Sequence, residues 1–326
     1  MNQPDTRSAA NRSSHPSARP STDWLGLSRR VCVVTGGGSG IGAAIGAGLA
    51  EAGAHVALLD RDAAAAARVA QSIRAQGGKA ISIECDVTSE TAVQAAAAQV
   101  ERQLGRCNAL VNNAGMLRAA SLDSVSLADW NAVLALNLTG YLLCAREFVK
   151  QMRRGGGGGA AGAAGAAGAA GAAGAVGSSN AGADGTAAGT QRGSMVHIAS
   201  IAAHYPQTSS GAYSASKAGI LQLSRQMAAE WGPQGVRSNA ICPGMIRTAL
   251  SEAFYAVPGV EQKRAAMTAN RRVGLPVDIA NAAVFLLSDR AAYVNGAELM
   301  VDGGMDCMLM DMVPRPGYND GPGKTQ

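Results

Sequence analysis

A glycine-rich turn between two short apolar strands is the feature that most limits what this chain can fold into. Val31-Cys-Val-Val34 has the pattern of a short buried strand, and it runs directly into the turn Thr35-Gly-Gly-Gly-Ser-Gly-Ile-Gly42. A helical stretch rich in Ala, Ile and Leu follows to about Ala52, and His55-Val-Ala-Leu-Leu59 is a second strand pattern that ends at Asp60. This order predicts one βαβ unit of a parallel sheet.

The same unit has the chemistry needed to bind a dinucleotide. Glycines allow a tight turn and let backbone N–H groups approach a pyrophosphate, which then lies at the positive N-terminus of the helix. An acid at the end of the second strand accepts hydrogen bonds from the hydroxyls of an adenosine ribose. A glycine-rich loop by itself is weak evidence, because it can be only a flexible turn. In the context of strand, helix and Asp60 we interpret it as a dinucleotide site.

Asp60 also bears on the choice between NAD and NADP. A carboxylate at this position repels a 2′-phosphate, and Gly37, Gly38 and Ser39 carry no basic group. The sequence therefore favours NAD. Arg61 keeps NADP open, because an arginine beside the ribose can accept a phosphate.

Strand and helix patterns continue to alternate along the chain. The expected strands after Asp60 are 79–84, 108–111, 195–199, 236–241 and 297–301, and the expected helices are 62–76, 90–104, 127–152, 211–232 and 276–289. This alternation predicts an α/β fold, a Rossmann-type doubly wound parallel sheet of about seven strands with helices on both faces, in a single domain. Ligands of such sheets bind beyond the carboxyl ends of the strands.

Asp86 and the turn Asn112-Asn-Ala-Gly115 fall at that edge of the sheet. Turn residues can instead cap local backbone, and this alternative stays open for Asn113. Asn137 lies inside the long helix, where an asparagine is mildly unfavourable, so both a polar role and simple surface exposure remain possible. The segment from Pro243-Gly244 to about Arg272 we interpret as an irregular lid over the cleft. Its apolar and aromatic side chains include Phe254, Tyr255, Val257 and Pro258.

Three stretches do not look like packed structure. Residues 1–29 are rich in Ser, Arg, Pro and Asn, which predicts a disordered tail, with a transit peptide as the alternative. Residues 155–193 form a Gly/Ala-rich low-complexity insert that joins a helix to a strand, at the sheet edge away from the cleft. Residues 305–326 form a C-terminal extension, and its apolar start favours a packing or subunit contact. The remaining chain, 30–304, is long enough for one α/β domain.

Composition excludes several functional classes. The formal net charge of +5 is not clustered in runs, so we expect no nucleic-acid binding. The six cysteines include no C-x-x-C pair and have no histidines at ligand spacing, which predicts neither a disulfide framework nor a metal site. These features fit a cytoplasmic protein, and no apolar run approaches the length of a membrane span.

Tyr213 and Lys217 form the candidate catalytic pair. Residues four apart share one face of a helix, where an ammonium stabilises a phenolate and lowers the pKa of the tyrosine. Such a hydroxyl can exchange a proton near neutral pH. The pattern also arises by chance, as an exposed tyrosine beside a solvated lysine. A dinucleotide site on the same side of the sheet as Ser200, thirteen residues before the tyrosine, favours the proton-transfer interpretation.

Together these motifs identify a family. They are Thr35–Gly42, Asp60, Asp86-Val87, Asn112-Asn-Ala-Gly115, Asn137, Ser200, Tyr213 with Lys217, Pro243-Gly244 and Asp302-Gly-Gly304. In this order and spacing the chain resembles the short-chain dehydrogenase/reductases from about residue 30 to 304, interrupted only by the Gly/Ala insert. The insert and the C-terminal extension have no counterpart in the family.

The resemblance implies a role for each matching residue. Tyr213 would be the general acid or base, Ser200 would orient the substrate oxygen, and Lys217 would lower the tyrosine pKa and hold the nicotinamide ribose. Asn137 would position a water that links Lys217 to solvent. The implied cofactor contacts are Gly36, Ser39, Ile41 and Gly42 at the phosphates, Asp60 at the adenosine ribose, Asp86 and Val87 at adenine, Asn112 near the other ribose, Tyr213 and Lys217, Pro243-Gly244, and Thr248 at the carboxamide. Family members are commonly homotetramers, so we expect a homo-oligomer, as a tetramer or a dimer.

The function that follows is an NAD-dependent alcohol dehydrogenase or ketone reductase that needs no metal. One alternative is an NADP-dependent enzyme of the 3-oxoacyl-carrier-protein reductase type, and another is a non-catalytic dinucleotide-binding regulator. Met116, Leu117, His204 and Tyr205, with the lid, suggest a moderately sized, largely apolar substrate. His204 can equally be a surface loop residue.

Overall fold

The structure, a computed structural model, describes residues 23–154, 192–248 and 251–315. Seven parallel strands form one sheet in the order β3-β2-β1-β4-β5-β6-β7, which confirms the predicted doubly wound sheet. Every residue of β1, β5 and β6 is buried, which explains why these strands are apolar on both faces. The strands are β1 (Val31–Thr35), β2 (His55–Asp60), β3 (Lys79–Glu84), β4 (Cys107–Asn112), β5 (Gly193–Ile198), β6 (Val236–Pro243) and β7 (Glu298–Val301).

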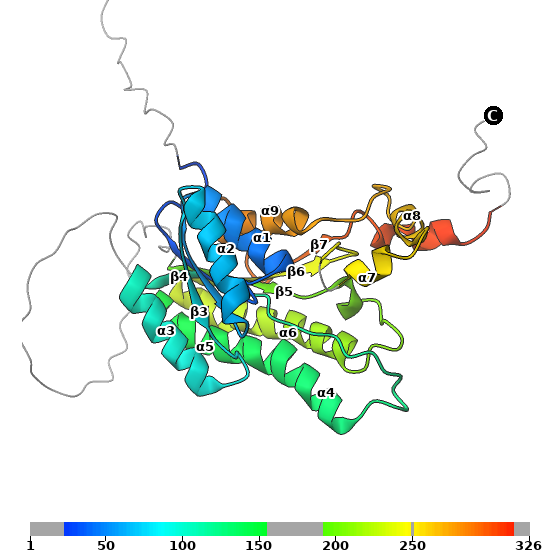
Figure 1. Ribbon diagram of the computed structural model, residues 1–326, viewed down its shortest axis with the longest axis horizontal. Coiled ribbons are helices and arrows are strands. Elements are labelled where there is room, and N and C mark those ends of the chain that lie inside the picture. Colours follow the sequence, from blue (N-terminus) through cyan, green and yellow to red (C-terminus); the bar gives the residue numbers. More distant parts are fainter. Residues whose placement is uncertain (1–22, 155–191, 249–250, 316–326) are drawn as a thin grey trace, which may run out of the picture.

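Helices cover both faces of this sheet (Figure 1). One face carries α1 (Gly40–Glu51), α2 (Ala63–Ala75) and α9 (Pro276–Leu287), whose buried residues share a core cluster with β1 and β2. The other face carries α3 (Glu90–Leu104), α5 (Gly140–Arg153) and α6 (Tyr213–Trp231). Two core clusters therefore flank the sheet, one on each face, and hold the strands in place.

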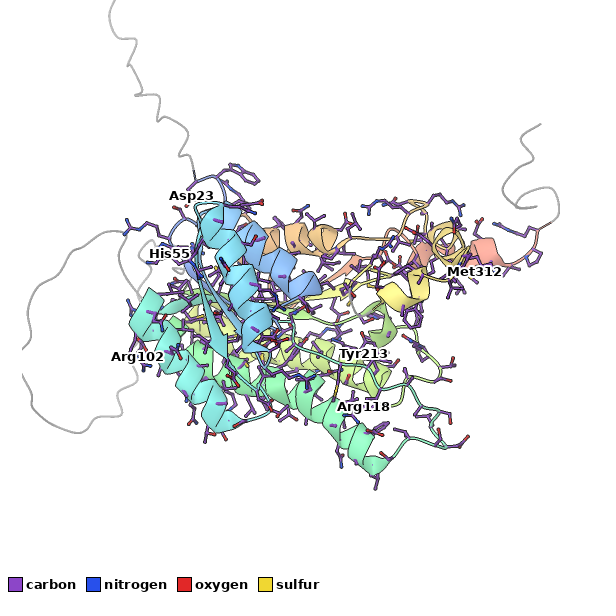
Figure 2. All side chains as sticks on the ribbon, viewed as in Figure 1. Asp23, His55, Arg102, Arg118, Tyr213 and Met312 are labelled. Atoms are coloured by element: carbon purple, nitrogen blue, oxygen red, sulfur yellow. The ribbon has the colours of Figure 1, made fainter. Side chains whose placement is uncertain are left out.

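The chain reverses its direction across the sheet between β1 and β4, which lie side by side. In an open α/β sheet the crevice outside the carboxyl ends of two such strands binds ligands. Figure 2 shows His55, at the start of β2, and Arg102 at one edge of the domain, with Tyr213 and Arg118 toward the other. The topology thus places the predicted catalytic tyrosine at the edge where a ligand would bind.

The long helix predicted over 127–152 is interrupted in the structure. It consists of α4 (Leu127–Leu134), a five-residue π-helix over Ala135–Thr139, and α5. A π-turn contains one extra residue, and such turns occur frequently at functional sites. Asn137 is the buried residue of this π-turn, which rules out the alternative of simple surface exposure.

By length and composition alone, the helical segment Leu127–Arg153 is long and apolar enough to cross a membrane. No apolar run of that length was expected from the sequence. The α5 half of this segment buries Tyr141, Cys144, Phe148 and Met152 against the sheet. This burial accounts for its apolar character, because a core helix also needs apolar residues.

Several predicted boundaries need correction. Residues 23–29, assigned to the tail, pack on the domain: Leu27 is fully buried, and Asp23 accepts a hydrogen bond from its amide at 3.1 Å. Strand β5 begins at Gly193 rather than at Met195, because Gly193 and Ser194 already pair with Val236 and Arg237 of β6. The predicted tail up to residue 22, the insert from 155 to 191, and residues 316–326 lie outside the described residues.

The segment predicted as an irregular lid contains two short helices, α7 (Glu252–Tyr255) and α8 (Val260–Ala266). Arg247 joins them, because its guanidinium pairs with Glu252 at 2.7 Å and with Glu261 at 3.2 Å. The start of the C-terminal extension forms a 3₁₀-helix over Asp306–Met312, with Met310 and Met312 largely exposed.

Candidate active site

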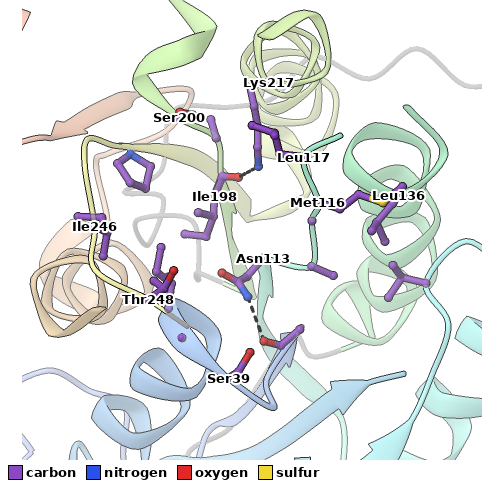
Figure 3. A pocket seen from close by; sticks show the side chains of 18 of the residues that line it. Ser39, Asn113, Met116, Leu117, Leu136, Ile198, Ser200, Lys217, Ile246 and Thr248 are labelled. Carbon is purple, nitrogen blue, oxygen red and sulfur yellow. Dashed lines mark hydrogen bonds between the residues drawn. The ribbon is translucent and has the colours of Figure 1, made fainter. Parts of the chain in front are cut away.

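A cleft of about 460 Å³ opens at the carboxyl ends of β1, β4, β5 and β6. Figure 3 shows side chains that face it from Ser39, on the glycine turn, and from Thr248, Ile198 and Lys217. This volume is in the usual range for small-molecule sites. The predicted residues that line it are Gly36, Ser39, Ile41, Asp60, Asp86, Val87, Met116, Leu117, Ser200, Tyr213, Lys217, Pro243, Gly244 and Thr248.

The glycine turn forms one wall of the cleft. Gly36 and Gly40 have φ of +62° and +52°, a conformation that side chains other than glycine rarely adopt. A Cβ at Gly40 would lie 3.5 Å from Thr248, an ordinary contact, so the positive φ rather than a lack of space favours glycine there. Ser39 makes no side-chain cap on α1, and the first turn of α1 contains no acid. The helix N-terminus can therefore receive an anion from the cleft.

Gly42 differs from its predicted role. A Cβ at this position would lie 2.1 Å from the carbonyl oxygen of Gly36, so the glycine lets α1 pack against the turn. Gly42 is buried and does not line the cleft, whereas Gly40 does. Sequence reasoning missed Gly40, because a run of glycines does not show which of them faces the ligand.

Two carboxylates lie at the end of the cleft beyond β2 and β3. Asp60 accepts hydrogen bonds from the amides of Gly38 at 2.9 Å and Asp62 at 3.0 Å, which fixes its carboxylate beside Arg61. Asp86 accepts hydrogen bonds from the amide and hydroxyl of Thr88, and these bonds lower its pKa. Asp86 is therefore ionised at neutral pH.

Asn112 does not take the predicted position near a ribose. It is fully buried, and its Nδ2 donates to the carbonyl of Tyr141 at 3.0 Å and contacts His197 Nδ1 at 3.1 Å. Asn113 is the asparagine that faces the cleft, and its Nδ2 donates to the carbonyls of Thr35 and Gly36. These bonds reach backbone 78 and 77 positions away in the chain, so Asn113 ties the end of β4 to the glycine turn and does not cap local backbone. Strand alternation turns the two neighbours in opposite directions.

Tyr213, Lys217 and Ser200 meet in the cleft. Tyr213 and Lys217 lie in the first turns of α6, and Ser200 follows the end of β5. The Lys217 ammonium lies 5.6 Å from the centre of the Tyr213 ring and donates to the Ile198 carbonyl at 2.8 Å (Figure 3). The Ser200 side chain lines the same cleft, close enough to Tyr213 to lower its pKa through a hydrogen bond.

The pKa values in this cluster follow burial. Burial raises the pKa of Tyr213, and the hydrogen bond from Ser200 offsets part of this rise. This direction is opposite to the one predicted from the Tyr–Lys spacing. Burial also lowers the pKa of Lys217 to about 8, because it disfavours the ammonium. Tyr213 is consequently protonated near neutral pH.

Asn137 lies next to this cluster without facing the cleft. Its Oδ1 accepts from the amide of Met116 at 2.9 Å, and its Nδ2 donates to the carbonyl of Met116 at 2.9 Å. Nδ2 also donates to the Ser216 hydroxyl at 3.1 Å. Asn137 therefore fixes the segment after Gly115, where a Cβ would lie 3.7 Å from Lys217 Nζ.

Comparison with known proteins decides the family. A family model described as short chain dehydrogenase matches residues 30–185, and one described as enoyl-(acyl carrier protein) reductase matches residues 174–306. D-threitol dehydrogenase of Mycolicibacterium smegmatis is 37% identical over 279 residues, which cover 85% of this chain and 93% of that protein. The chain belongs to the short-chain dehydrogenase/reductase family. It is thus an oxidoreductase that acts on CH–OH groups.

Solved structures of other short-chain dehydrogenases share this fold. A 7α-hydroxysteroid dehydrogenase complexed with NADH and 7-oxo glycochenodeoxycholic acid has a TM-score of 0.73 at 33% identity, covering 86% of this chain and 96% of that chain. A gluconate 5-dehydrogenase from Beutenbergia cavernae, described as putative, NAD(P) dependent and with bound NADP, has a TM-score of 0.72 at 33% identity. It covers 87% of this chain and 99% of that chain. Similar short-chain dehydrogenases therefore bind either nicotinamide cofactor.

The substrate side of this short-chain dehydrogenase is only partly the predicted one. Met116 and Leu117 line the cleft, together with Ile246 and Leu136, which sequence reasoning did not single out. His204 pairs with Glu298 of β7 at 3.1 Å and is not among the lining residues, which favours its surface alternative. Apolar residues of a loop and a helix gave no periodic signal that would mark them as lining the cleft.

A buried polar network lies beneath the cleft and was also missed. His197 of β5 contacts Asn112 through Nδ1 and the Ser238 hydroxyl through Nε2, each at 3.1 Å. The Asn112 amide donates to Nδ1, so the ring proton is on Nε2 and points to Ser238. Ser238 in turn hydrogen-bonds to Ser224 of α6 at 3.0 Å. This network joins β4, β5, β6 and α6 in the neutral form of the histidine.

His197 should make the fold sensitive to acid. Burial lowers its pKa to about 4, from 6.5 in an exposed histidine, so the unfolded chain takes up a proton first as the pH falls. Protonation of His197 therefore has no effect on the free energy of unfolding above pH 6.5, and it should lower that free energy by about 3 kcal/mol when the pH reaches 4. Urea unfolding of the wild type and of His197→Asn at pH 7 and pH 4 measures this difference. An equal decrease in the free energy of unfolding from pH 7 to pH 4 in both proteins would show that His197 is not the acid-sensitive group.

Proposed function

We propose that this protein transfers a hydride between NAD(H) and a secondary alcohol or ketone, with Tyr213 as general acid and base. The observation that carries the proposal is the meeting of Tyr213, Ser200 and Lys217 in the same cleft as the glycine turn and Asp60. The cleft thus combines groups for proton transfer with groups for dinucleotide binding.

The residues present fit a bound dinucleotide. Gly36, Ser39 and Ile41 offer a backbone turn at the N-terminus of α1, which suits a pyrophosphate. Asp60 suits the adenosine ribose diol, and Asp86 and Val87 flank the space for adenine. Pro243, Gly244 and Thr248 line the opposite end, where the nicotinamide would lie. The nicotinamide supplies the hydride acceptor or donor.

The roles of the protein side chains follow from their positions. Ser200 orients the substrate oxygen toward Tyr213, since both side chains line the same cleft. Tyr213 gives a proton to the oxygen in ketone reduction and takes one in alcohol oxidation. Lys217 stabilises the phenolate that remains, and Asn137 holds the Gly115–Met116 backbone so that a water can link Lys217 to solvent.

NAD is the cofactor that the charges favour. Asp60 and Asp86 both face the adenosine end, and a 2′-phosphate would meet the Asp60 carboxylate. Arg61 supports the second candidate, an NADP-dependent enzyme of the 3-oxoacyl-carrier-protein reductase type, because it also lines this end. Two carboxylates against one arginine make NAD the better fit.

The substrate we propose is a moderately sized, largely apolar secondary alcohol or ketone. Met116, Leu117 and Ile246 are apolar residues that line the cleft (Figure 3). The purified protein should oxidise members of an alcohol panel, or reduce members of a ketone panel, faster with NAD(H) than with NADP(H), as followed by nicotinamide absorbance. A faster rate with NADP(H) would select the second candidate. Binding of NADH without turnover of either panel would point to a regulator.

The two directions of the reaction should have opposite pH dependence. Because burial raises the pKa of Tyr213, the residue is protonated near neutral pH and ready to act as an acid. Alcohol oxidation should therefore increase as the pH rises above neutrality, with a slope near one in a plot of log(kcat/KM) against pH, while ketone reduction should stay level and decline only when the pH passes the raised pKa of Tyr213. Profiles of both directions in one buffer series measure this. An oxidation rate that falls with rising pH would contradict the assignment.

A further inference from the structure

Lys217 is held as a buried amine without a carboxylate partner. Its side chain is 4% exposed, and in the described ranges 23–154, 192–248 and 251–315 no Asp or Glu forms an ion pair with it. Its one hydrogen bond within the described protein is to the Ile198 carbonyl at 2.8 Å. Burial of an unpaired ammonium is unfavourable, so neutral groups must supply much of its stabilisation.

Two aromatic rings supply such groups. Lys217 Nζ lies 5.7 Å from the centre of the Tyr141 ring and 5.6 Å from that of Tyr213. An ammonium over the face of a tyrosine within about 6 Å is attracted by the ring quadrupole, and more strongly when it is desolvated. Tyr213 already has a part in the proposed reaction. Tyr141 has none, and it lies on a different helix, α5.

Tyr141 is fixed in this position by several contacts. Its side chain is 1% exposed, and its hydroxyl donates to the Ile198 carbonyl at 3.1 Å, the same oxygen that accepts from Lys217. Its ring stacks on His197 with a centroid distance of 6.1 Å, and its backbone carbonyl accepts from Asn112 at 3.0 Å. A ring held this way cannot turn its face from the ammonium without breaking buried hydrogen bonds.

We propose that Tyr141 is a positioning residue for the reaction, because its ring face keeps Lys217 in the ammonium form. This inference rests on the proposed roles of Tyr213 and Lys217. It names a second tyrosine that acts through the lysine and does not touch the substrate.

The titratable groups around Lys217 come from four elements. They are Tyr213 on its own helix, Tyr141 on α5, Cys242 on β6 and, behind Tyr141, His197 on β5. His197 is neutral, because burial lowers its pKa to about 4. The pKa of Lys217, lowered by burial to about 8, lies close to working pH, so a modest loss of attraction would change its charge.

Direct titration of Lys217 tests the inference without turnover. The chain has five lysines, so the ¹³Cε signal of Lys217 can be assigned in labelled apoprotein by its loss in Lys217→Arg. In Tyr141→Leu the pH midpoint of the Lys217 titration should fall by roughly 0.5 to 1.5 pH units. Tyr141→Phe keeps the ring, so its Lys217 midpoint should stay near that of the wild type. Phe148→Leu is the matched control, an equally buried aromatic about 10 Å further along α5.

The pH profile provides the functional counterpart. In Tyr141→Leu the Lys217 ammonium loses its proton at lower pH and stabilises the Tyr213 phenolate less. The rise of the alcohol oxidation rate with pH should therefore move to higher pH in Tyr141→Leu, whereas Tyr141→Phe should keep the wild-type profile. Tyr141→Met, which fills the space without a ring, replaces Tyr141→Leu if that variant does not fold. Equal midpoints in Tyr141→Leu and wild type, or an equal shift in Phe148→Leu, would overturn the inference. An active Tyr213→Phe would instead refute the proposed function and leave the Lys217 midpoints unaffected.

Discussion

Replacement of Tyr213 by phenylalanine should lower kcat by roughly 10²- to 10⁴-fold, the usual contribution of a general acid or base. The substitution removes one hydroxyl and keeps the ring that faces Lys217 at 5.6 Å. Binding of NADH, measured by the change in its fluorescence, should stay within a few-fold of the wild type. The rate loss should therefore appear in kcat, because the lost interaction belongs to the transition state.

Tyr205→Phe is the control for this prediction. Tyr205 is 48% exposed on the loop after Ser200 and does not line the cleft, so its hydroxyl should not matter to turnover. A Tyr213→Phe variant with a rate within tenfold of the wild type would exclude the tyrosine as the proton donor. Loss of NADH binding in that variant would show that Tyr213 is structural.

Replacement of Asp60 by asparagine should change the ratio of kcat/KM for NAD to that for NADP by about 10²-fold in favour of NADP. A hydrogen bond to a charged group contributes about 1.5–3 kcal/mol, and the neutral amide also removes the repulsion of a 2′-phosphate. Asparagine keeps an oxygen that can accept from the amides of Gly38 or Asp62, so the turn should survive. Steady-state kinetics with both cofactors measure the ratio.

Asp62→Asn is the matched control for Asp60→Asn. Asp62 caps α2 by accepting from the Ala65 amide at 2.9 Å, so its neutralisation changes the local charge equally without touching the ribose site. If both variants shift the preference alike, the effect is long-range electrostatics and Asp60 has no special contact. Arg61→Ala should lower the use of NADP in the Asp60→Asn background if Arg61 accepts the phosphate.

Local patterns predicted the elements well where short-range physics sets them. Helix α3 was expected over 90–104 and has those limits, because Ser89 caps its start and Gly105, with φ of +100°, ends it. Strand β3 likewise has its expected limits. For α3 the deciding residues are neighbours in sequence, so the local pattern contains the cause.

The site was predicted in its residue types and only partly in its geometry. Tyr213, Lys217, Ser200 and Asp60 line one cleft, as their positions after strands and on one helix face required. Asn112 and Gly42 turned inward, because the sides they face depend on packing against Tyr141 and Gly36. The direction of the Tyr213 pKa was also wrong, since burial by the surrounding domain has a larger effect than a neighbour four residues away.

Strand and helix periods, glycine turns and the Tyr–Lys spacing are local properties of the chain, so the fold and the residue types of the cleft could be predicted from residue order alone. The surroundings that stabilise the charge of Lys217 depend instead on long-range packing. Tyr141 contacts Lys217, which is 76 positions away in the chain, and His197 contacts Asn112, which is 85 positions away. Neither Tyr141 nor His197 stands out in the sequence of its helix or strand. Such long-range contacts depend on how the helices pack on the sheet, and they cannot be predicted from the periodicity of the sequence.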